Sequence, residues 1–460
     1  MPVIPSDSNL SGKGLHPFHF FSYRGAHYRI SIHEMSVCRI SSKEFASKEF
    51  IQVSSPTGPD IPSGHFLPHV PEPLDEKHPV AAMDLFVVQS CNLSCLYCYG
   101  DDGTYGERAW MSEKTAMQAV DWLIDASGCV KTLRINFFGG EPLLNFPLMK
   151  TIVSYVLARG EAAEKKTLFQ VTTNGTLLDD EIIIFLQKHD FKVLVSLDGP
   201  KDIHDKQRRF ADGGGSYDAV TKHLGSLIAS VPDTDVHAVI MGDTDPKVVI
   251  NALEGFGFRG ISVLPASGSL FSKADEGKEN RDSAAILQRM EEEAELWIDL
   301  ARKRDIMGLQ HLKSYSQFAA ALKTLLQNRK NYHPCGAAIG LVAVSCSGDI
   351  YPCHRFVGQN HYRIGNIFSK ELDRTSYLKS PVMTSENCID CFARFYCAGG
   401  CKQDNVISGS SLFSPSEDMC RIRRRQFELA AYITAELANE ERLLLEQAGI
   451  IPSKPCPLDL

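Results

Sequence analysis

The sequence predicts an α/β fold in which six parallel strands alternate with crossover helices, as an open sheet or a partial barrel. Short apolar segments of strand length alternate over residues 82–264 with longer segments of helical periodicity. Each strand, helix and following strand favours parallel pairing with a right-handed crossover. The 460 residues exceed one typical domain and 43% of them are apolar, so we expect two or three domains.

The N-terminal region is expected to hold strands followed by a linker. Strand-like segments at residues 16–21 and 28–32 are joined by a turn near Arg24 and Gly25, and a third strand is predicted at 37–40. From residue 54 to 79, proline and polar residues dominate without periodicity. This composition is typical of a linker that runs over a surface.

The alternating region gives the strands and helices of the main fold. The predicted strands are 83–88, 133–138, 167–172, 192–196, 236–241 and 261–264. The predicted helices between them are 112–126, 147–159, 180–189, 218–230 and 245–256. The strands are nearly continuous apolar runs, which favours burial on both faces. Further helices are predicted at 283–304 and 311–328, and a last helix at 422–447.

Composition and charge argue against several classes of function. The net charge of -8 gives no general attraction to nucleic acid or to an anionic membrane, and the basic run 421–425 is typical of a solvated helix face. No apolar stretch approaches the roughly 20 residues needed to span a bilayer, and a secretion signal is not recognisable. We therefore expect a cytoplasmic protein whose fourteen cysteines are mostly reduced, so clustered cysteines predict metal ligands.

Three cysteines follow the first strand of the alternating region. Cys91, Cys95 and Cys98 have the spacing C-x3-C-x2-C, with Tyr97 inside the last gap. Three thiolates can hold three irons of a cubane cluster and leave the fourth iron open to a reacting ligand. A zinc knuckle is the alternative, since zinc accepts similar spacings. The position at the carboxyl end of a strand, where barrel enzymes place their chemistry, favours the cluster.

Polar and glycine-rich segments follow the next three strands. They are residues 139–142 (Gly-Gly-Glu-Pro), 172–176 (Thr-Thr-Asn-Gly-Thr) and 196–200 (Ser-Leu-Asp-Gly-Pro). Each segment alone is an ordinary turn signal. Three in succession, each at the carboxyl end of a strand, predict one site at that edge of the sheet together with the cysteine loop. Glycines let the backbone approach a ligand, and Glu141 can accept hydrogen bonds from an ammonium group. We expect a site for a zwitterionic molecule beside an iron.

Together these motifs resemble those of radical S-adenosylmethionine enzymes over roughly residues 83–264. The resemblance implies a 4Fe-4S cluster on the three loop cysteines, with S-adenosylmethionine on the open iron. Its reductive cleavage would give a 5'-deoxyadenosyl radical that abstracts hydrogen from a substrate. Glu141 and its glycines would bind the methionine ammonium, Ser196 would contact the cofactor, and Tyr97 would lie near the adenine. The residues implied to bind the cofactor are Tyr97, Gly139, Gly140, Glu141, Asn174, Ser196 and Arg208.

Arg208 enters this set through a separate motif. Residues 204–208 (His-Asp-Lys-Gln-Arg) match an HDxxR element of the maturase branch of that family. A guanidinium can bind a carboxylate through two parallel hydrogen bonds, which makes Arg208 a candidate carboxylate partner. Its neighbour Arg209 competes for the role.

A second group of cysteines follows residue 328. Its members are Cys335, Cys353, Cys388, Cys391, Cys397, Cys401 and Cys420. A region without strong helical periodicity cannot form a good core, and metal ligation would replace one by linking distant turns. Structural zinc is the alternative to iron. The spacing resembles the SPASM extension of peptide-modifying radical enzymes, which carries two auxiliary 4Fe-4S clusters.

The resemblance also implies ligands for each auxiliary cluster. Auxiliary cluster I would use Cys335, Cys353 and Cys401. Cys346 is the candidate for its fourth ligand, and an open or substrate-bound iron is the alternative. Auxiliary cluster II would use Cys388, Cys391, Cys397 and Cys420. Three 4Fe-4S clusters and S-adenosylmethionine are therefore the expected cofactors.

The expected fold is thus a partial (β/α)6 TIM-like barrel with an N-terminal β-hairpin region and a C-terminal iron–sulfur (SPASM) extension. The predicted divisions are N-terminal strands and linker at 1–80, barrel at 81–310, bridging helix at 311–334, auxiliary-cluster domain at 335–425, and C-terminal helix and tail at 426–460. Relatives often begin with a winged-helix-like module that adds a leader peptide to a sheet edge. Residues 16–50 have strands but little room for its helices, so a partial leader-binding module and a hairpin that caps the barrel remain alternatives.

Two family activities compete as the expected reaction. Anaerobic sulfatase maturases oxidise a cysteine or serine to formylglycine, and they carry an aspartate base directly after the second cysteine of the extension. This sequence has His354 at that position, which counts against sulfatase maturation and makes His354 the candidate catalytic residue. The loop after Cys98 is similar to those of thioether-forming maturases of ribosomally made peptides.

We therefore favour a thioether bond from a peptide cysteine to a carbon atom, with formylglycine formation, carbon–carbon crosslinking and epimerisation as alternatives. The expected partners are a ribosomally made precursor peptide and an electron donor such as flavodoxin or ferredoxin, without nucleic acid or membrane. Outside this family, the alternative is a zinc-rich scaffold that binds protein or nucleic acid through residues 421–425.

Overall fold

The computed structural model describes residues 17–47, 74–242, 244–266, 283–316, 318–369, 371–379 and 381–450. These residues divide into two compact units. The sheet unit takes in residues of the ranges 73–277 and 335–379, and the helical unit takes in those of the ranges 1–72, 278–334 and 380–457. The predicted auxiliary-cluster domain, 335–425, is therefore shared between the two units.

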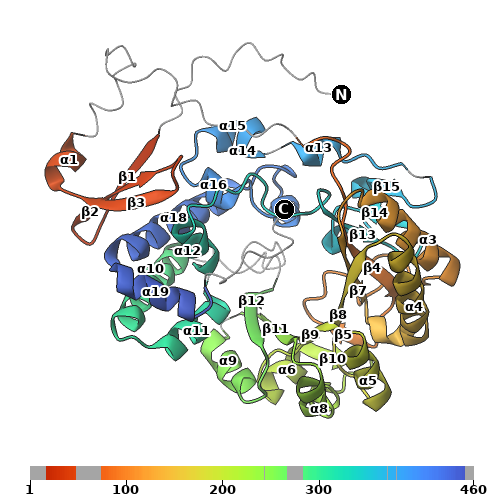
Figure 1. Ribbon diagram of the computed structural model, residues 1–460. Coiled ribbons are helices and arrows are strands. Elements are labelled where there is room, and N and C mark those ends of the chain that lie inside the picture. The colour runs from red at the N-terminus through yellow and green to blue at the C-terminus, as the bar shows by residue number, and fades with distance from the viewer. Residues whose placement is uncertain are drawn as a thin grey trace. The chain divides into compact units, whose positions relative to one another are not determined.

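The sheet unit is built on one sheet whose central strands are parallel (Figure 1). Neighbouring strands follow the order β12, β11, β9, β8, β7, β4, β13, β14 and β15, with β6 (Ala109–Trp110) beside β4. The central strands are β4 (Ala82–Gln89), β7 (Thr132–Gly139), β8 (Lys166–Thr173), β9 (Lys192–Ser196), β11 (Thr234–Ile240) and β12 (Gly260–Pro265). They match the six predicted strands within two residues at each end, and the predicted α/β partial barrel is confirmed.

The crossover helices follow the predicted order. They are α3 (Glu113–Ala126), α4 (Phe146–Ala162), α5 (Asp180–Lys188), α6 (Lys201–Gln207), α7 (Tyr217–Thr221), α8 (Leu224–Ser230) and α9 (Pro246–Glu254). The side chains of Ser112, Asp179 and Asp245 accept hydrogen bonds from first-turn amides, which fixes where α3, α5 and α9 begin. The single helix predicted at 218–230 is interrupted, because His223 leaves the helical region with φ -109°.

Burial on both faces is wrong for most of these strands. β4 is buried along its whole length, but buried and half-buried side chains alternate in β9 and through most of β8 and β11. Alternation at the strand period means that one face packs against the core while the other stays open. The open face therefore carries polar residues such as Gln170, Ser196 and His237.

Three strands of the cysteine-rich region extend this sheet. β13 (Leu341–Val344) runs parallel to β4, and β14 (Asp349–Tyr351) and β15 (Gly365–Asn366) follow it antiparallel. These strands were not predicted, because they have at most four residues each. Their pairing attaches Cys346 and Cys353 to the sheet unit.

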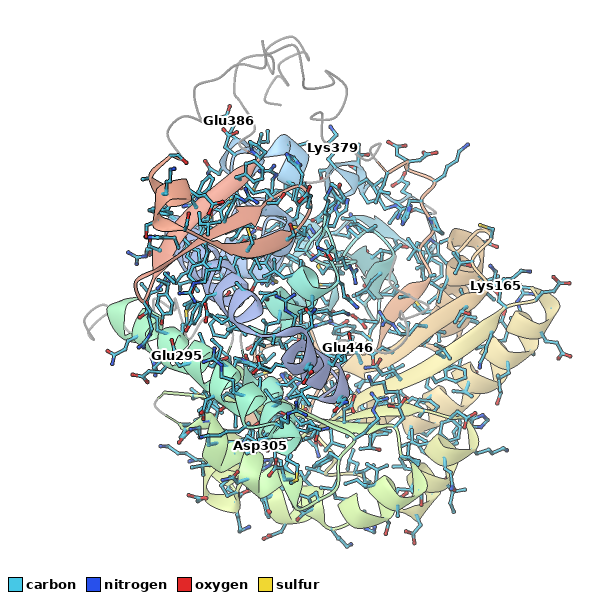
Figure 2. The ribbon with its side chains drawn as sticks, turned by 60° about the vertical axis from the view of Figure 1, so that its left-hand side comes forward. Lys165, Glu295, Asp305, Lys379, Glu386 and Glu446 are labelled. Carbon is cyan, nitrogen blue, oxygen red and sulfur yellow. The ribbon has the colours of Figure 1, made fainter. Side chains whose placement is uncertain are left out.

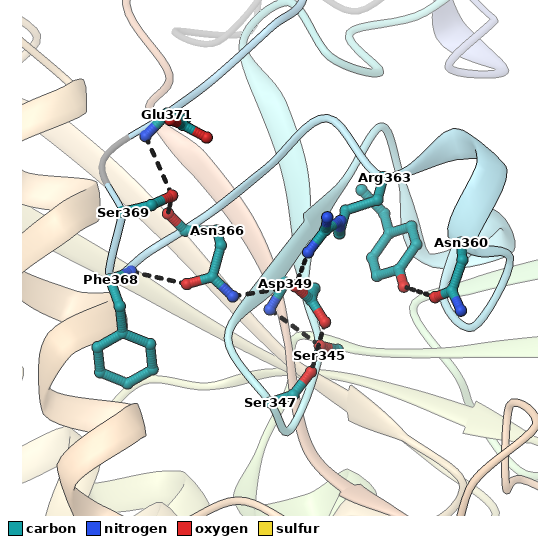
Figure 3. Close-up of polar contacts among 10 residues, drawn as sticks. Ser345, Ser347, Asp349, Asn360, Arg363, Asn366, Phe368, Ser369 and Glu371 are labelled. Carbon is teal, nitrogen blue, oxygen red and sulfur yellow. Dashed lines mark hydrogen bonds and ion pairs between the residues drawn. The ribbon is translucent and has the colours of Figure 1, made fainter.

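The turn from β13 to β14 is held by Asp349 (Figure 3). Its carboxylate accepts hydrogen bonds from Ser347 Oγ at 2.7 Å, Asn366 Nδ2 at 2.9 Å and Arg363 Nη1 at 3.0 Å. Burial alone would raise the pKa of Asp349, but these donors hold it below its usual value. The Asp349 amide donates to Ser345 Oγ, so both flanks of Cys346 are fixed.

The helical unit begins with an antiparallel meander of β1 (Phe18–Tyr23), β2 (Ala26–Ser31) and β3 (Ser36–Ile40), followed by α1 (Ser42–Ala46). Arg24 and Gly25 have φ values of 48° and 76°, the pair of left-handed residues that a two-residue hairpin turn requires. The three predicted strands are confirmed. Most of the linker predicted at 54–79 lies outside the described residues.

The larger helices of this unit are α10 (Ser283–Arg302), α11 (Ile306–Tyr315), α12 (Ala319–Leu326), α18 (Glu417–Glu436) and α19 (Asn439–Gln447). The shorter helices of this unit are α14 (Pro381–Thr384), α15 (Glu386–Ile389), α16 (Arg394–Cys397) and α17 (Lys402–Ile407). Another short helix, α13 (Thr375–Leu378), belongs to the sheet unit. α10 packs against α18 with Trp297 and Phe427 fully buried. Glu295 on α10, labelled in Figure 2, accepts a hydrogen bond from Tyr432 of α18 at 3.1 Å.

The single helices predicted at 311–328 and 422–447 are wrong, since each is broken by polar side chains. Ser316 Oγ accepts hydrogen bonds from Trp297 Nε1 and the Phe318 amide, both at 3.0 Å, between α11 and α12. Between α18 and α19, Glu441 accepts from the Ala438 amide at 2.7 Å, and Arg442 donates to carbonyls of the last turn of α18. Such caps end a helix without glycine or proline. Among the described residues, no helix has the length and apolar character needed to cross a membrane.

Candidate active site

The three cysteines of the C-x3-C-x2-C loop lie just after the carboxyl end of β4. A short strand within the loop, β5 (Leu93–Cys95), pairs antiparallel with β10 (Arg208–Phe210), and Cys95 lies opposite Arg208. The three thiols interact electrostatically with one another. The fold therefore brings the cysteine loop and the HDxxR element together, as neither motif alone could indicate.

The surroundings of these thiols fit cluster ligands. Burial raises the pKa of Cys91 to about 12 and that of Cys95 to about 11. Coordination to a metal removes the proton from a thiol, so a bound cluster would offset this cost of burial. The Leu93 amide and Asn174 Nδ2 lie 3.4 and 3.7 Å from Cys91 Sγ as donors, which suits a thiolate.

Glu141 joins the ends of two strands. It is fully buried, and its carboxylate accepts hydrogen bonds from the Asn174 amide at 2.6 Å, Thr173 Oγ1 at 2.8 Å and the Leu143 amide at 3.0 Å. Burial raises the pKa of Glu141 to about 7, although these three donors oppose the shift. In this structure the carboxylate thus holds β8 against the short 3-10 helix over Pro142–Asn145 that follows β7.

Gly139 and Gly140 make room for backbone. A Cβ on Gly139, where φ is 139°, would lie 2.0 Å from the Val88 carbonyl oxygen. A Cβ on Gly140 would lie 2.1 Å from the Ser90 carbonyl oxygen. The close approach that glycine permits here is to the start of the cysteine loop.

Asn174 orients the loop from the end of β8. Its Nδ2 donates to Asn92 Oδ1 at 2.9 Å besides contacting Cys91 Sγ, and its Oδ1 accepts from Thr176 Oγ1 at 2.7 Å. Ser196, the last residue of β9, is half-buried and lies beside His237 of β11. Both predicted residues therefore lie at the expected edge of the sheet.

A buried triad anchors Tyr97. Asp198 is fully buried and accepts hydrogen bonds from Tyr97 Oη at 2.5 Å and Arg208 Nε at 3.0 Å, and from the Val239 amide at 2.9 Å. The Arg208 guanidinium also lies over the Tyr97 ring at 5.3 Å. Burial would lower the pKa of Arg208, but Asp198 raises it overall. Arg208 pairs here with Asp198, a carboxylate of the chain itself, and its expected contact with the cofactor stays a prediction.

His204 supports this triad from the HDxxR element. Its Nδ1 accepts from the Asp198 amide at 3.2 Å, and its Nε2 pairs with Ser216 Oγ at 2.9 Å. Ser216 Oγ donates in turn to the Arg208 carbonyl at 2.8 Å. Burial lowers the pKa of His204 to about 4, so the ring is neutral near pH 7. Arg209 is exposed and donates to the Asp205 carbonyl, so it takes no part in the triad.

His354 pairs with a residue that sequence reasoning missed. Its Nδ1 lies 2.9 Å from Asp84 Oδ2, and its ring stacks on Phe138 at 4.8 Å. Burial would raise the pKa of Asp84, but hydrogen bonds from His354 and Asn136 hold it below its usual value. A lone aspartate inside the apolar run of β4 was the available signal.

The cysteines of the sheet unit differ in setting. Cys335 is exposed and Cys353 is half-buried. Cys346 is buried, and its thiol donates to the Phe86 carbonyl at 3.1 Å and to the Ala109 carbonyl at 3.6 Å. Burial raises the pKa of Cys346 to about 12. These contacts disfavour Cys346 as a fourth cluster ligand. Cys401, at the start of α17, belongs to the helical unit.

The other four cysteines share one pocket in the helical unit. Cys388, Cys391, Cys397 and Cys420 line one pocket formed by α15, α16, the loop after α16 and the first turn of α18. Interactions between their charges link Cys391 to the other three. The structure thus brings together all four cysteines predicted to hold auxiliary cluster II.

Within the described ranges, no three His, Cys, Asp or Glu side chains converge as ligands of one metal ion. A four-iron cluster takes one thiolate per iron, so its ligands stand further apart than those of a single ion.

Comparison with known proteins shows what this chain is similar to. Residues 85–249 match the Radical SAM superfamily. The cysteine-type anaerobic sulfatase-maturating enzyme of Clostridium perfringens is 24% identical over 335 residues, which cover 68% of this chain and 86% of that protein. The radical SAM cyclopropyl synthase TigE of Paramaledivibacter caminithermalis is 23% identical over 345 residues, which cover 70% of this chain and 68% of TigE.

A solved structure shares the fold. Native anSMEcpe with bound AdoMet and Cp18Cys peptide superposes with a TM-score of 0.62 at 19% sequence identity, covering 81% of this chain and 100% of that one. The likeness therefore extends beyond the residues that match the superfamily.

Proposed function

We propose that this chain, whose residues 85–249 match the Radical SAM superfamily, is an enzyme that modifies a ribosomally made peptide by joining a cysteine sulfur to a carbon of another residue. The observation that carries the proposal is the second group of gathered thiols, Cys388, Cys391, Cys397 and Cys420, in a pocket of their own. One cluster suffices to cleave the cofactor, so a further cluster would serve to accept an electron or to bind a substrate thiolate. Relatives named for sulfatase maturation and cyclopropyl synthesis, and anSMEcpe with its bound peptide, support a peptide substrate.

Residues of the sheet unit would hold the first cluster. When bound, the 4Fe-4S cluster and S-adenosylmethionine would supply the radical that abstracts hydrogen from the substrate. Cys91, Cys95 and Cys98 would ligate three irons, and Asn174 would keep Cys91 in place through its 3.7 Å contact with the sulfur. Asp198 would fix the Tyr97 side chain. Glu141, Ser196 and the two glycines remain proposed contacts of the cofactor.

We also propose two auxiliary clusters. Cys388, Cys391, Cys397 and Cys420 would hold one, and Cys335 and Cys353 would be ligands of the other. The assignment of Cys401, which belongs to the helical unit, stays a prediction from the sequence. With Cys346 bonded to backbone carbonyls of the sheet, an open or substrate-bound iron is the favoured arrangement at the second of these.

His354 favours thioether formation over formylglycine formation, since it stands where sulfatase maturases carry an aspartate. Its ring is held between Asp84 and Phe138, and its side chain is 34% exposed. It remains our candidate for the residue that contacts the reacting peptide.

Mass spectrometry of the peptide product tests the reaction. We expect the reconstituted enzyme to lower the mass of a cysteine-containing precursor peptide by that of two hydrogen atoms. The product should also have one fewer free thiol, as counted with an alkylating reagent. Both losses occur because the new carbon–sulfur bond replaces one C–H and one S–H bond. A product aldehyde would indicate formylglycine, loss of hydrogen with a retained thiol would indicate carbon–carbon crosslinking, and unchanged mass would indicate epimerisation. Any of these three results would contradict the thioether assignment.

The remaining partners follow from the same proposal. An electron donor such as flavodoxin or ferredoxin would reduce the first cluster, and the enzyme would work in the cytoplasm. The meander of β1, β2 and β3 with α1 supports a partial leader-binding module, because an edge strand can pair with an extended peptide.

The pH dependence of S-adenosylmethionine binding tests Glu141. If its carboxylate meets the methionine ammonium, it must first lose the proton that its pKa of about 7 retains below neutrality. We expect the affinity of the wild type to rise about tenfold per pH unit up to pH 7 and then level off. The affinity of Glu141→Gln should not show this additional rise. Calorimetric titration between pH 5.5 and 8.5 measures this. Parallel profiles for the two proteins would limit Glu141 to holding the strand ends.

The raised pKa of Glu141 also predicts how the stability of the protein without cofactor depends on pH. A folded-state pKa of about 7 lies above the ordinary value of 4.5, so the folded chain binds the extra proton in this window. The contribution to stability is therefore present at low pH and is lost as the pH rises from about 4.5 to about 7. Glu141→Gln should lack this loss.

A further inference from the structure

Three arginines line the pocket that holds Cys388, Cys391, Cys397 and Cys420. They are Arg394, Arg423 and Arg424. The solvated helix face predicted for 421–425 is therefore wrong for Arg423 and Arg424. It is also wrong for Ile422, which is 7% exposed, and for Arg425, whose side chain is 20% exposed. Arg421 does face outward, with its side chain 52% exposed and paired with Asp418 at 3.1 Å.

Arg394 has an unfilled donor in this pocket. Only 4% of its surface is exposed, and its Nη1 donates to the Cys391 carbonyl at 3.2 Å. Its Nη2 is buried without a hydrogen-bond partner in the described part of the chain. Burying a guanidinium nitrogen without an acceptor costs free energy of folding, so an anionic acceptor bound beside Arg394 Nη2 would be stabilising. The sulfurs of a cluster on the four cysteines would be such acceptors.

The other two arginines add positive charge. Arg423 donates to Gln426 Oε1 at 3.0 Å and Tyr396 Oη at 3.3 Å, and it interacts electrostatically with Cys397. Arg424 bonds to the Cys391 thiol as well as to Glu417 at 3.1 Å. Burial would lower the pKa of both guanidiniums, yet Tyr396 and Cys397 raise the pKa of Arg423, and Cys391 raises that of Arg424.

The loop cysteines have the opposite setting. The fully buried carboxylates of Glu141 and Asp198 act on Cys91 and Cys95 respectively. Arg208, which favours the Cys95 thiolate, is already paired with Asp198 at 3.0 Å. Glu141 and Asp198 thus add negative charge near the loop thiols, whereas Arg394, Arg423 and Arg424 add positive charge to the pocket of the helical unit.

We propose that Arg394, with Arg423 and Arg424, raises the reduction potential of the cluster held in this pocket. Positive charge and N–H donors to sulfur stabilise the reduced cluster, which carries one more negative charge than the oxidised one. The inference rests on the proposed function, because it requires that the four cysteines hold a cluster. The higher potential would make this cluster easier to reduce than the cluster on the loop.

An EPR-monitored redox titration of the full-length, anaerobically reconstituted enzyme tests the proposal. Cys91, Cys95 and Cys98 are first replaced by alanine so that auxiliary signals are seen alone, and the signal of this pocket is identified by its loss in Cys388→Ala. In Arg394→Met we expect a shift to lower potential, equivalent to at least a tenfold fall in the ratio of reduced to oxidised cluster, about 59 mV for one electron. Arg394→Lys keeps the charge without the planar fork and should shift less.

Arg302→Met is the matched control. Arg302 belongs to the same unit, carries the same charge and lies 3.6 Å from Glu436. Its removal should leave the potential unchanged. If Arg394→Met retains its iron and the same potential, the inference fails although the cluster stands. If the four pocket cysteines can be replaced by alanine without loss of iron, the proposed cluster itself fails. Should Arg394→Met not fold, Arg424→Met decides the sign of the shift, because this side chain is 35% exposed.

Discussion

Replacing Cys91, Cys95 and Cys98 together by alanine abolishes the release of 5'-deoxyadenosine from S-adenosylmethionine. We expect a fall of at least about a thousandfold, because no iron remains at the loop to bind the cofactor or to pass it an electron. Chromatographic detection of 5'-deoxyadenosine after anaerobic incubation with a chemical reductant measures the loss. The loop joins the rest of the sheet unit through β5 and β10, so its remaining backbone pairing should survive.

Iron counting separates loss of the first cluster from general damage. The triple variant should lose about four irons per chain and keep those of the auxiliary sites. Cys129→Ala serves as the control, since Cys129 is an exposed thiol outside both groups. It should leave both iron content and cofactor cleavage unchanged. Cleavage that persists in the triple variant would refute the role assigned to the loop.

The long elements of the fold could be predicted because several local signals agree on each of them. β9 was predicted at its observed bounds, and α3 begins directly after the cap residue Ser112. The short strands β5 and β10 could not be predicted, since three residues carry no periodicity and their pairing is decided by tertiary contact. Yet this pair is what brings Cys95 to Arg208.

The same distinction applies to the site. The resemblance to the SPASM extension grouped Cys388, Cys391, Cys397 and Cys420, which the structure brings together in one pocket. Spacing alone would have joined Cys401 to Cys397. Partners from distant strands follow from sheet register, which no local pattern reports. The pairing of His354 with Asp84 and the burial of Cys346 on β4 both arise in that way.

Asp198→Asn should destabilise the sheet unit by about 3–5 kcal/mol, because it leaves the Arg208 charge buried without its counter-ion. Asp198 is fully buried and Arg208 is 7% exposed, so water cannot replace the lost carboxylate. Chemical denaturation of the variant measures the effect. Asp235→Asn is the matched control: Asp235 pairs with Arg259 at 2.9 Å, but the arginine is 52% exposed, so we expect about 1 kcal/mol or less.

A double variant separates stability from catalysis in the same triad. Asp198→Asn with Arg208→Met removes both buried charges, so it should be more stable than the sum of the single losses indicates, by about 1–3 kcal/mol. Cofactor cleavage should stay about a hundredfold below wild type in the double variant, because Tyr97 has lost the carboxylate that fixes it inside the cysteine loop. If cleavage recovers together with stability, the triad supports the fold alone and Tyr97 needs no such anchor.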